Sequence, residues 1–203
     1  MPARTVPVPP APDDKRVRFY RAALACVSVA GLDATSVEDV ARAAGSSRAT
    51  LYRTFPGGRD QLVRETVEWE VTTFFASLAL AVADRPDLEA KLTTGLVVGR
   101  RAMAEHTLLQ RLLRTEPEAM LGELSATNVL VLEAIITYLA GELDAARHRG
   151  EVRADCDVVE ASDHLARLFL SYLGSPGRWD FDDPAQVQEL VRGQFLAGVR
   201  VPG

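Results

Sequence analysis

Five side chains between positions 47 and 53 have the chemistry to bind a negatively charged ligand: Ser47, Arg48, Thr50, Tyr52 and Arg53. Hydroxyl, phenol and guanidinium groups all donate hydrogen bonds, and arginine adds a permanent positive charge. A helix over this segment would bury Leu51 and Phe55 and leave the polar groups outward or sideways. An exposed helix of this kind suits entry into the DNA major groove.

A short helix before this segment is predicted to support it. The helix should run from about residue 37 to 44, with Ser36 at its N-cap and Asp39 completing a capping box. Its buried face consists of apolar residues at helical spacing: Val37, Val40, Ala41 and Ala44.

A tight turn then joins the two helices. Gly45 supplies it, because glycine adopts a left-handed backbone without penalty. Ser46 and Ser47 can cap the second helix, expected over residues 48–54.

The run from Val37 to Phe55, V-x-x-V-A-x-A-A-G-S-S-R-A-T-L-Y-R-T-F, resembles the helix-turn-helix of the TetR family of bacterial transcriptional regulators. The resemblance covers roughly Asp14 to Leu62. The family usually enters its next helix through F-x-S-K-E-x-L. This chain is one residue longer there and has Arg59 where a lysine is common.

The resemblance implies that Ser47, Thr50 and Tyr52 contact DNA phosphates. We predict that Arg48 reads a base edge. We also predict a phosphate contact for Arg59, because the free N–H groups at a helix start favour an anion. The full predicted DNA-binding set is Ser36, Ser47, Arg48, Ala49, Thr50, Tyr52, Arg53 and Arg59.

The charge distribution supports a basic N-terminal head. Acidic residues outnumber Lys and Arg by 28 to 23 over the whole chain, which argues against a nonspecific polyanion binder. Residues 1–60 nevertheless carry nine basic and six acidic groups, a net charge of +3, whereas residues 61–203 carry fourteen and twenty-two, a net of −8. The basic end is the end with the helix-turn-helix pattern.

Patterns typical of enzymes and metal sites are missing from the sequence. The three histidines have no metal-ligand spacing, and there is no phosphate-binding glycine loop or nucleophile elbow. Glu116-Pro117-Glu118 is more typical of a helix start than of a carboxylate pair. We expect no enzymatic activity, no cofactor and no metal. The two cysteines are expected to be free thiols. Without a signal peptide or an apolar run of about 20 residues, a cytoplasmic protein with no membrane partner is expected.

Helical periodicity continues to the C-terminus, so the predicted fold class is all-α. Five prolines in residues 1–12 predict a disordered arm. Whether that arm reaches DNA is open. We expect a helix-turn-helix DNA-binding domain over residues 13–62 and a ligand-binding and dimerisation domain over residues 63–203. The expected helices span residues 14–31, 37–44, 48–54, 59–83, 88–105, 108–113, 118–149, 158–173 and 184–199.

The family resemblance implies a small-molecule cavity in the C-terminal domain. Most of its candidate lining residues are apolar and would fit a plain core equally well. His164 is either a core histidine or a polar anchor for a ligand. A predominance of aliphatic groups indicates a hydrophobic effector. The candidate lining residues are Trp69, Phe74, Leu96, Met103, Leu112, Ile135, Tyr138, His164, Leu168 and Tyr172.

The last two predicted helices are apolar on more than one side, which is typical of a two-fold four-helix interface between subunits. The alternative is that they fill the core of their own chain. The predicted interface residues are Leu165, Phe169, Leu190, Val191 and Phe195.

The sequence therefore predicts a homodimeric, ligand-responsive DNA-binding regulator, most simply a repressor of a palindromic operator in double-stranded DNA. Two alternatives stay open. One is a helical small-molecule-binding or interaction protein without specific DNA binding, and the other is a nonspecific nucleoid-type binder.

Overall fold

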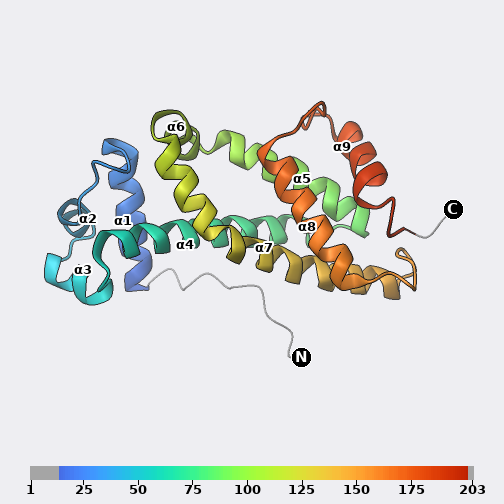
Figure 1. The fold of residues 1–203 in the computed structure, drawn as a ribbon, viewed down its shortest axis with the longest axis horizontal. Coiled ribbons are helices and arrows are strands. Elements are labelled where there is room, and N and C mark those ends of the chain that lie inside the picture. Colours follow the sequence, from blue (N-terminus) through green and yellow to red (C-terminus); the bar gives the residue numbers. More distant parts are fainter. Residues whose placement is uncertain (1–13, 201–203) are drawn as a thin grey trace. The chain divides into compact units, whose positions relative to one another are not determined.

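The structure, a computed structural model, describes residues 14–200, and the side chains of residues 119–128 and 130 lie outside that description. The described chain is all-α, as predicted (Figure 1). An isolated antiparallel bridge between Val152 and Arg200 is its only β-type pairing. The predicted arm at residues 1–12 lies outside the described residues. Over the described range, no helix is both long and apolar enough to cross a membrane.

The observed helices confirm the predicted ones to within two residues at nearly every end. The exception is the last helix, which changes to a π-helical segment, η1, around Gly193. The elements are α1 Lys15–Ala30, α2 Val37–Ala43, α3 Arg48–Thr54, α4 Gly58–Val82, α5 Leu88–Glu105, α6 Thr107–Thr115, α7 Pro117–His148, α8 Val158–Gly174, α9 Pro184–Leu190 and η1 Val191–Phe195.

The described residues form two compact units. The head unit contains residues 14–74 and 107–129, and the body unit contains residues 75–106 and 130–200. Helices α4 and α7 each contribute to both units without a break. The division into functional domains at residues 13–62 and 63–203 stays a prediction.

The core of the head unit is built on aromatic rings. The ring of Phe19 meets Phe55 edge-on, with centroids 5.7 Å apart, and Tyr20 lies between Phe55 and Trp69, at 6.0 and 5.8 Å. Leu51 of α3 is completely buried in the same cluster. These contacts fix α3 against α1 and the start of α4.

A polar network closes one side of this core. The carboxylate of Glu65 accepts hydrogen bonds from the Tyr20 hydroxyl (2.8 Å), from the Gln61 amide (2.7 Å) and from the Arg16 guanidinium. Burial opposes ionisation of Glu65, but these three donors outweigh it and lower the pKa of its carboxyl. Burial and the bond to Glu65 raise the pKa of Tyr20 to about 12. The network therefore holds Glu65 ionised and Tyr20 protonated at neutral pH.

In the body unit, α5 packs against α8 and α9 (Figure 1). Two glycines on α5 lie next to α8, and only one of them has no room for a side chain. A β-carbon at Gly95 would lie 3.4 Å from the Phe169 ring, and one at Gly99 would lie only 2.8 Å from a methyl group of Leu173. Leu173 is itself 2 % exposed, so it has little room to move.

Replacing Gly99 with alanine should therefore destabilise the chain. Overpacking a core costs about 1–3 kcal/mol, which exceeds the gain of up to ~1 kcal/mol that alanine brings to a helix interior. Chemical denaturation at a fixed protein concentration measures the change.

The matched control for Gly99→Ala is Gly141→Ala. Gly141 lies on an exposed part of α7 with no atom within 4 Å of an added β-carbon. This variant should be as stable as the parent or more stable. If both variants unfold at the same denaturant concentration, close packing at Gly99 is not a constraint.

Candidate nucleic-acid interface and ligand cavity

The turn and the cap that orient α3 are those the sequence indicates. Gly45 has a positive φ of 60°, which allows the sharp turn after α2. The Ser47 hydroxyl accepts a hydrogen bond from the Thr50 backbone N–H (3.1 Å), which caps α3. Ser36 caps α2 in the same way, accepting from the Asp39 N–H at 3.2 Å.

The residues predicted to face DNA lie mostly on the surface of this motif. Tyr52 is 38 % exposed, a large value for a side chain of its kind. Thr50 is half-buried, and its hydroxyl accepts a hydrogen bond from the Ser47 hydroxyl at 3.0 Å. Ser36 is also half-buried. The exposed members of the predicted set are Ser47, Arg48, Ala49, Tyr52 and Arg53.

Arg48 already has two partners on this surface. Its guanidinium forms an ion pair with Glu38 of α2 at 2.7 Å and lies over the ring of Tyr52, 5.4 Å from the ring centre. The Glu38 carboxylate would repel a DNA phosphate but restrains the arginine next to α3. The base contact predicted for Arg48 stays a prediction.

Arg59 is half-buried at the start of α4 and binds the loop between α1 and α2. Its guanidinium donates to the backbone carbonyls of Leu32 (2.6 Å) and Thr35 (3.2 Å). It thus ties α4 to the loop that leads into α2. The predicted phosphate contact of Arg59 stays a prediction.

Helix α6 holds the end of α1. Arg111 donates to the backbone carbonyls of Val27, at 2.6 Å, and Ser28. These carbonyls belong to the last turn of α1, where the helix dipole favours a cation. Arg111 therefore caps α1 from a helix about 80 residues further along the sequence.

Glu116, which the sequence analysis assigned only to a helix start, binds the same loop. Its carboxylate accepts from the backbone N–H groups of Leu32 (3.1 Å) and Asp33 (2.9 Å). No local pattern reveals this contact, because its partners lie 83 and 84 residues away. Leu32 is therefore held through its N–H by Glu116 and through its carbonyl by Arg59.

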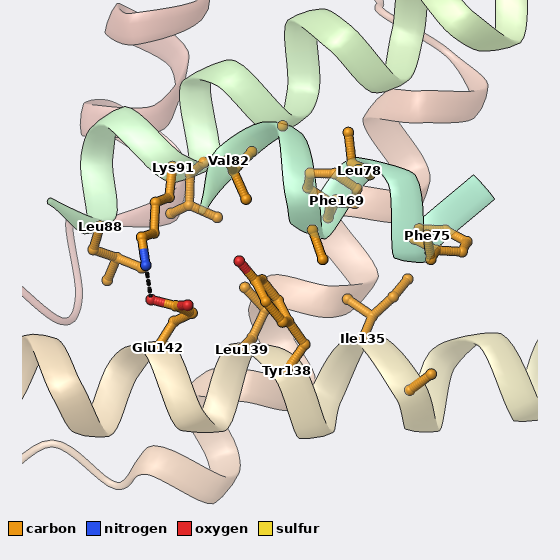
Figure 2. A pocket seen from close by; sticks show the side chains of 14 residues that line it. Phe75, Leu78, Val82, Leu88, Lys91, Ile135, Tyr138, Leu139, Glu142 and Phe169 are labelled. Atoms are coloured by element: carbon orange, nitrogen blue, oxygen red, sulfur yellow. Dashed lines mark hydrogen bonds and ion pairs between the residues drawn. The ribbon is translucent and has the colours of Figure 1, made fainter. Parts of the chain in front are cut away.

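The body unit contains an apolar cavity between α4, α5 and α7, with Phe169 of α8 at its edge (Figure 2). The cavity volume is about 60 Å³, several times the ~10–15 Å³ that one water molecule needs on the same measure. The lining residues are Phe75, Leu78, Ala79, Val82, Leu88, Lys91, Leu92, Gly95, Ala134, Ile135, Tyr138, Leu139, Glu142 and Phe169.

Only three of the lining residues carry polar groups. Lys91 and Glu142 form an ion pair at 2.6 Å, and Figure 2 shows Tyr138 rising from α7 into the space beside them. Burial raises the pKa of Tyr138, and the negative charge of Glu142 raises it further, so the phenol stays protonated. In the part of the chain that the structure describes, no cluster of His, Cys, Asp or Glu could hold a metal ion.

Two of the ten predicted lining residues, Ile135 and Tyr138, line this cavity. The sequence analysis missed Lys91 and Glu142. Glu142 had a signal, since it follows Ile135, Tyr138 and Leu139 at helical spacing. The eight predicted residues that do not line it are Trp69, Phe74, Leu96, Met103, Leu112, His164, Leu168 and Tyr172.

Several of these eight have other roles. Trp69 packs against Tyr20, and Leu112 packs in a small cluster with Val27 and Leu32. Tyr172 bonds to Gln194 through its hydroxyl. His164 is exposed on α8, so the interpretation as a core histidine is wrong, because the helix turns its Leu165 side inward instead.

The five predicted interface residues are already covered within one chain. Each is at most 7 % exposed, because α5 packs on α8, α9 and η1. Their burial therefore follows from the chain's own core, the alternative that the sequence left open. Their assignment to a subunit interface stays a prediction. The five are Leu165, Phe169, Leu190, Val191 and Phe195.

Comparison with known proteins agrees with the motif. The family model described as "Bacterial regulatory proteins, tetR family" matches residues 19–66. An uncharacterised HTH-type transcriptional regulator of Mycobacterium bovis is 29% identical over 138 residues, which cover 68% of this chain and 69% of that protein.

Solved structures share the fold over nearly the whole chain. A TetR-family regulator from Mesorhizobium loti is 22% identical, with a TM-score of 0.62, covering 92% of this chain and 97% of that one. The complex of the Stenotrophomonas maltophilia repressor SmeT with triclosan is 20% identical, with a TM-score of 0.60, covering 93% of each. With the helix-turn-helix formed by α2 and α3, the match over residues 19–66 identifies the DNA-binding part of the chain as that of the TetR family of bacterial transcriptional regulators.

Proposed function

We propose that the chain is a ligand-responsive repressor. A homodimer binds a palindromic operator through two α3 helices and leaves it when a small hydrophobic effector enters the cavity of the body unit. The observation that carries this proposal is the surface of α3, where hydroxyl, phenol and guanidinium groups are exposed above a buried apolar side.

DNA contact is supported by the way these groups are held. Ser47 and Thr50 are fixed by the cap of α3, and Arg48 is restrained by Glu38 and Tyr52. Side chains ordered before binding lose less entropy when they meet their ligand. We assign Ser36, Ser47, Thr50 and Tyr52 to the phosphates and Arg48 to a base edge, with Ala49 and Arg53 on the same face.

A response to a ligand is supported by the cavity. Its lining is apolar except at one end, as is usual for sites that bind small molecules. Two proteins with the same fold hold small molecules, triclosan in SmeT and stearoyl-CoA in FadR of Bacillus subtilis. Four lining residues lie on α4, the helix that begins next to α3. An effector that favours another position of α4 would shift the population away from the DNA-binding state.

A homodimer is the assembly that a palindromic operator requires, with its two α3 helices about one DNA turn apart, ~34–36 Å, or a multiple of it. The exposed side of α8 is the better candidate for the interface now that its inner side is covered. His164, Arg167 and Ser171 lie there, with the half-buried Leu168 between them.

Recovery of genomic DNA tests the function as a whole. The full chain, mixed with fragments of the DNA of its own organism, should retain one or a few sites with two-fold symmetry. Broad recovery would favour a nonspecific binder, and no recovery would favour the alternative of a small-molecule-binding protein without DNA specificity.

Arg48→Ala should weaken operator binding by about 1–3 kcal/mol and relax the base preference at one position in each half-site. Glu38→Gln should instead strengthen binding, because it releases Arg48 and removes a negative charge facing the DNA. Fluorescence anisotropy with operator variants measures both. Arg85→Ala, an exposed arginine after α4, is the charge-matched control. An unchanged base preference in Arg48→Ala would exclude readout by this residue.

Leu168→Glu should separate the subunits while leaving each chain folded. A carboxylate on the exposed side of α8 stays hydrated in a monomer but would be buried in the interface. Leu165→Glu, one turn away and fully buried, should unfold the chain. Sedimentation and circular dichroism distinguish the two results. A folded dimer of normal stability in Leu168→Glu would remove this side of α8 from the interface.

A further inference from the structure

The polar end of the cavity is electrically balanced before any ligand enters. The Lys91 ammonium lies 2.6 Å from the Glu142 carboxylate, and both side chains are mostly buried, at 16 % and 18 % exposed. Figure 2 shows the pair bridging α5 and α7 at one end of the cavity. The remaining lining residues apart from Tyr138 are apolar or glycine.

The charges around this pair are also matched. Glu151 accepts from the Leu88 backbone N–H at 3.1 Å, at the start of α5, and pairs with Arg149. Asp87 caps α5 by accepting from the Ala90 N–H at 2.7 Å. The two cations and two of the carboxylates therefore cancel, and the third carboxylate is held by a helix N-terminus, which favours negative charge.

This balance disfavours a charged ligand. A carboxylate next to Lys91 would compete with Glu142, and an ammonium next to Glu142 would compete with Lys91. Either one would leave an excess charge in an apolar cavity, which is among the most costly arrangements in a protein.

An uncharged polar group avoids this cost. An ammonium has three N–H donors, and the structure gives one from Lys91 to Glu142. The others can donate to a ligand oxygen without breaking the ion pair. The protonated Tyr138 hydroxyl beside the pair donates its one hydrogen to Glu142 and can accept a further hydrogen bond from a ligand.

We infer that this cavity selects an uncharged effector with an apolar body and one hydrogen-bonding oxygen, an alcohol or a carbonyl, placed at the Lys91–Glu142 pair. The apolar body lies among the leucine, isoleucine and phenylalanine side chains of α4, α5, α7 and α8. This inference rests on the proposed function, because it names the class of effector for the same cavity.

Three probes of equal chain length test it: 1-octanol, octanoate and octylammonium. Titration calorimetry with the full chain at neutral pH should show that 1-octanol binds about tenfold or more tightly than either ion. The apolar parts are identical, so the difference reports on the polar end alone. Tighter binding of octanoate or octylammonium would overturn the inference while supporting a ligand site in this cavity.

Failure of all three probes to bind would overturn both the inference and the effector site, whereas DNA binding is decided separately by genomic recovery.

Variants of the Lys91–Glu142 pair test whether the polar group of the ligand binds there. Glu142→Gln leaves Lys91 unpaired and should reverse the preference towards octanoate. Lys91→Met leaves Glu142 unpaired and should reverse it towards octylammonium.

Tyr138→Phe keeps both charges and the shape of the ring, so it should fold even if the charge variants do not. It should weaken binding of 1-octanol several-fold, and Phe75→Leu at the apolar side is the control that should affect the three probes equally. If the ratio of 1-octanol to octanoate affinity is the same in Tyr138→Phe, Glu142→Gln and the parent, the polar end does not select the ligand.

Discussion

A helix of seven residues cannot maintain itself in water, because helix nucleation costs more than so few hydrogen bonds return. The recognition helix α3 has this length, so its position is set almost entirely by what lies beneath it. Leu51 and Phe55 are fully buried in one cluster with Phe19, whose ring meets Phe55 edge-on, and Arg16 lies over the Phe55 ring, 5.1 Å from its centre. The DNA-binding surface is therefore as well defined as this small aromatic core.

The loop between α1 and α2 is the second determinant of the head unit. Within the loop, Thr35 donates to the carbonyls of Leu32 and Gly31, and charged side chains from distant parts of the sequence supply further partners. Arg59 of α4 donates to the Leu32 carbonyl, and Glu116 accepts from the Leu32 N–H. Arg111 of α6 donates to the carbonyls of Val27 and Ser28 in the last turn of α1. The same few backbone groups thus connect three helices, and a shift of α6 against α1 has to break charge-assisted hydrogen bonds, which are stronger than neutral ones.

Local signals were enough to predict much of this chain. Caps such as Ser36 and Ser47, and turns such as Gly45, act within four residues, so α2 and α3 begin where the sequence predicts. The cavity depends on how four helices pack, and apolar periodicity shows which side of a helix is buried but not against what. The same periodicity therefore predicts Ile135 and Tyr138, which line the cavity, and Leu112 and Trp69, which pack elsewhere. Likewise, the apolar sides of the last two helices do not reveal that α5 covers Phe195 within the chain, and its place in a subunit interface stays a prediction.

The missing side chain at Gly95 determines how far the cavity extends. Phe169 belongs to α8, yet its ring lines the cavity because nothing on α5 stands in its way at this position. A methyl group there would lie 3.4 Å from that ring and 3.7 Å from Val82, which is ordinary van der Waals contact. Alanine would thus fit without disturbing the helices and would occupy space otherwise open to a ligand. A single nucleotide change in a glycine codon can produce that alanine, so one mutation would be enough to make the cavity smaller.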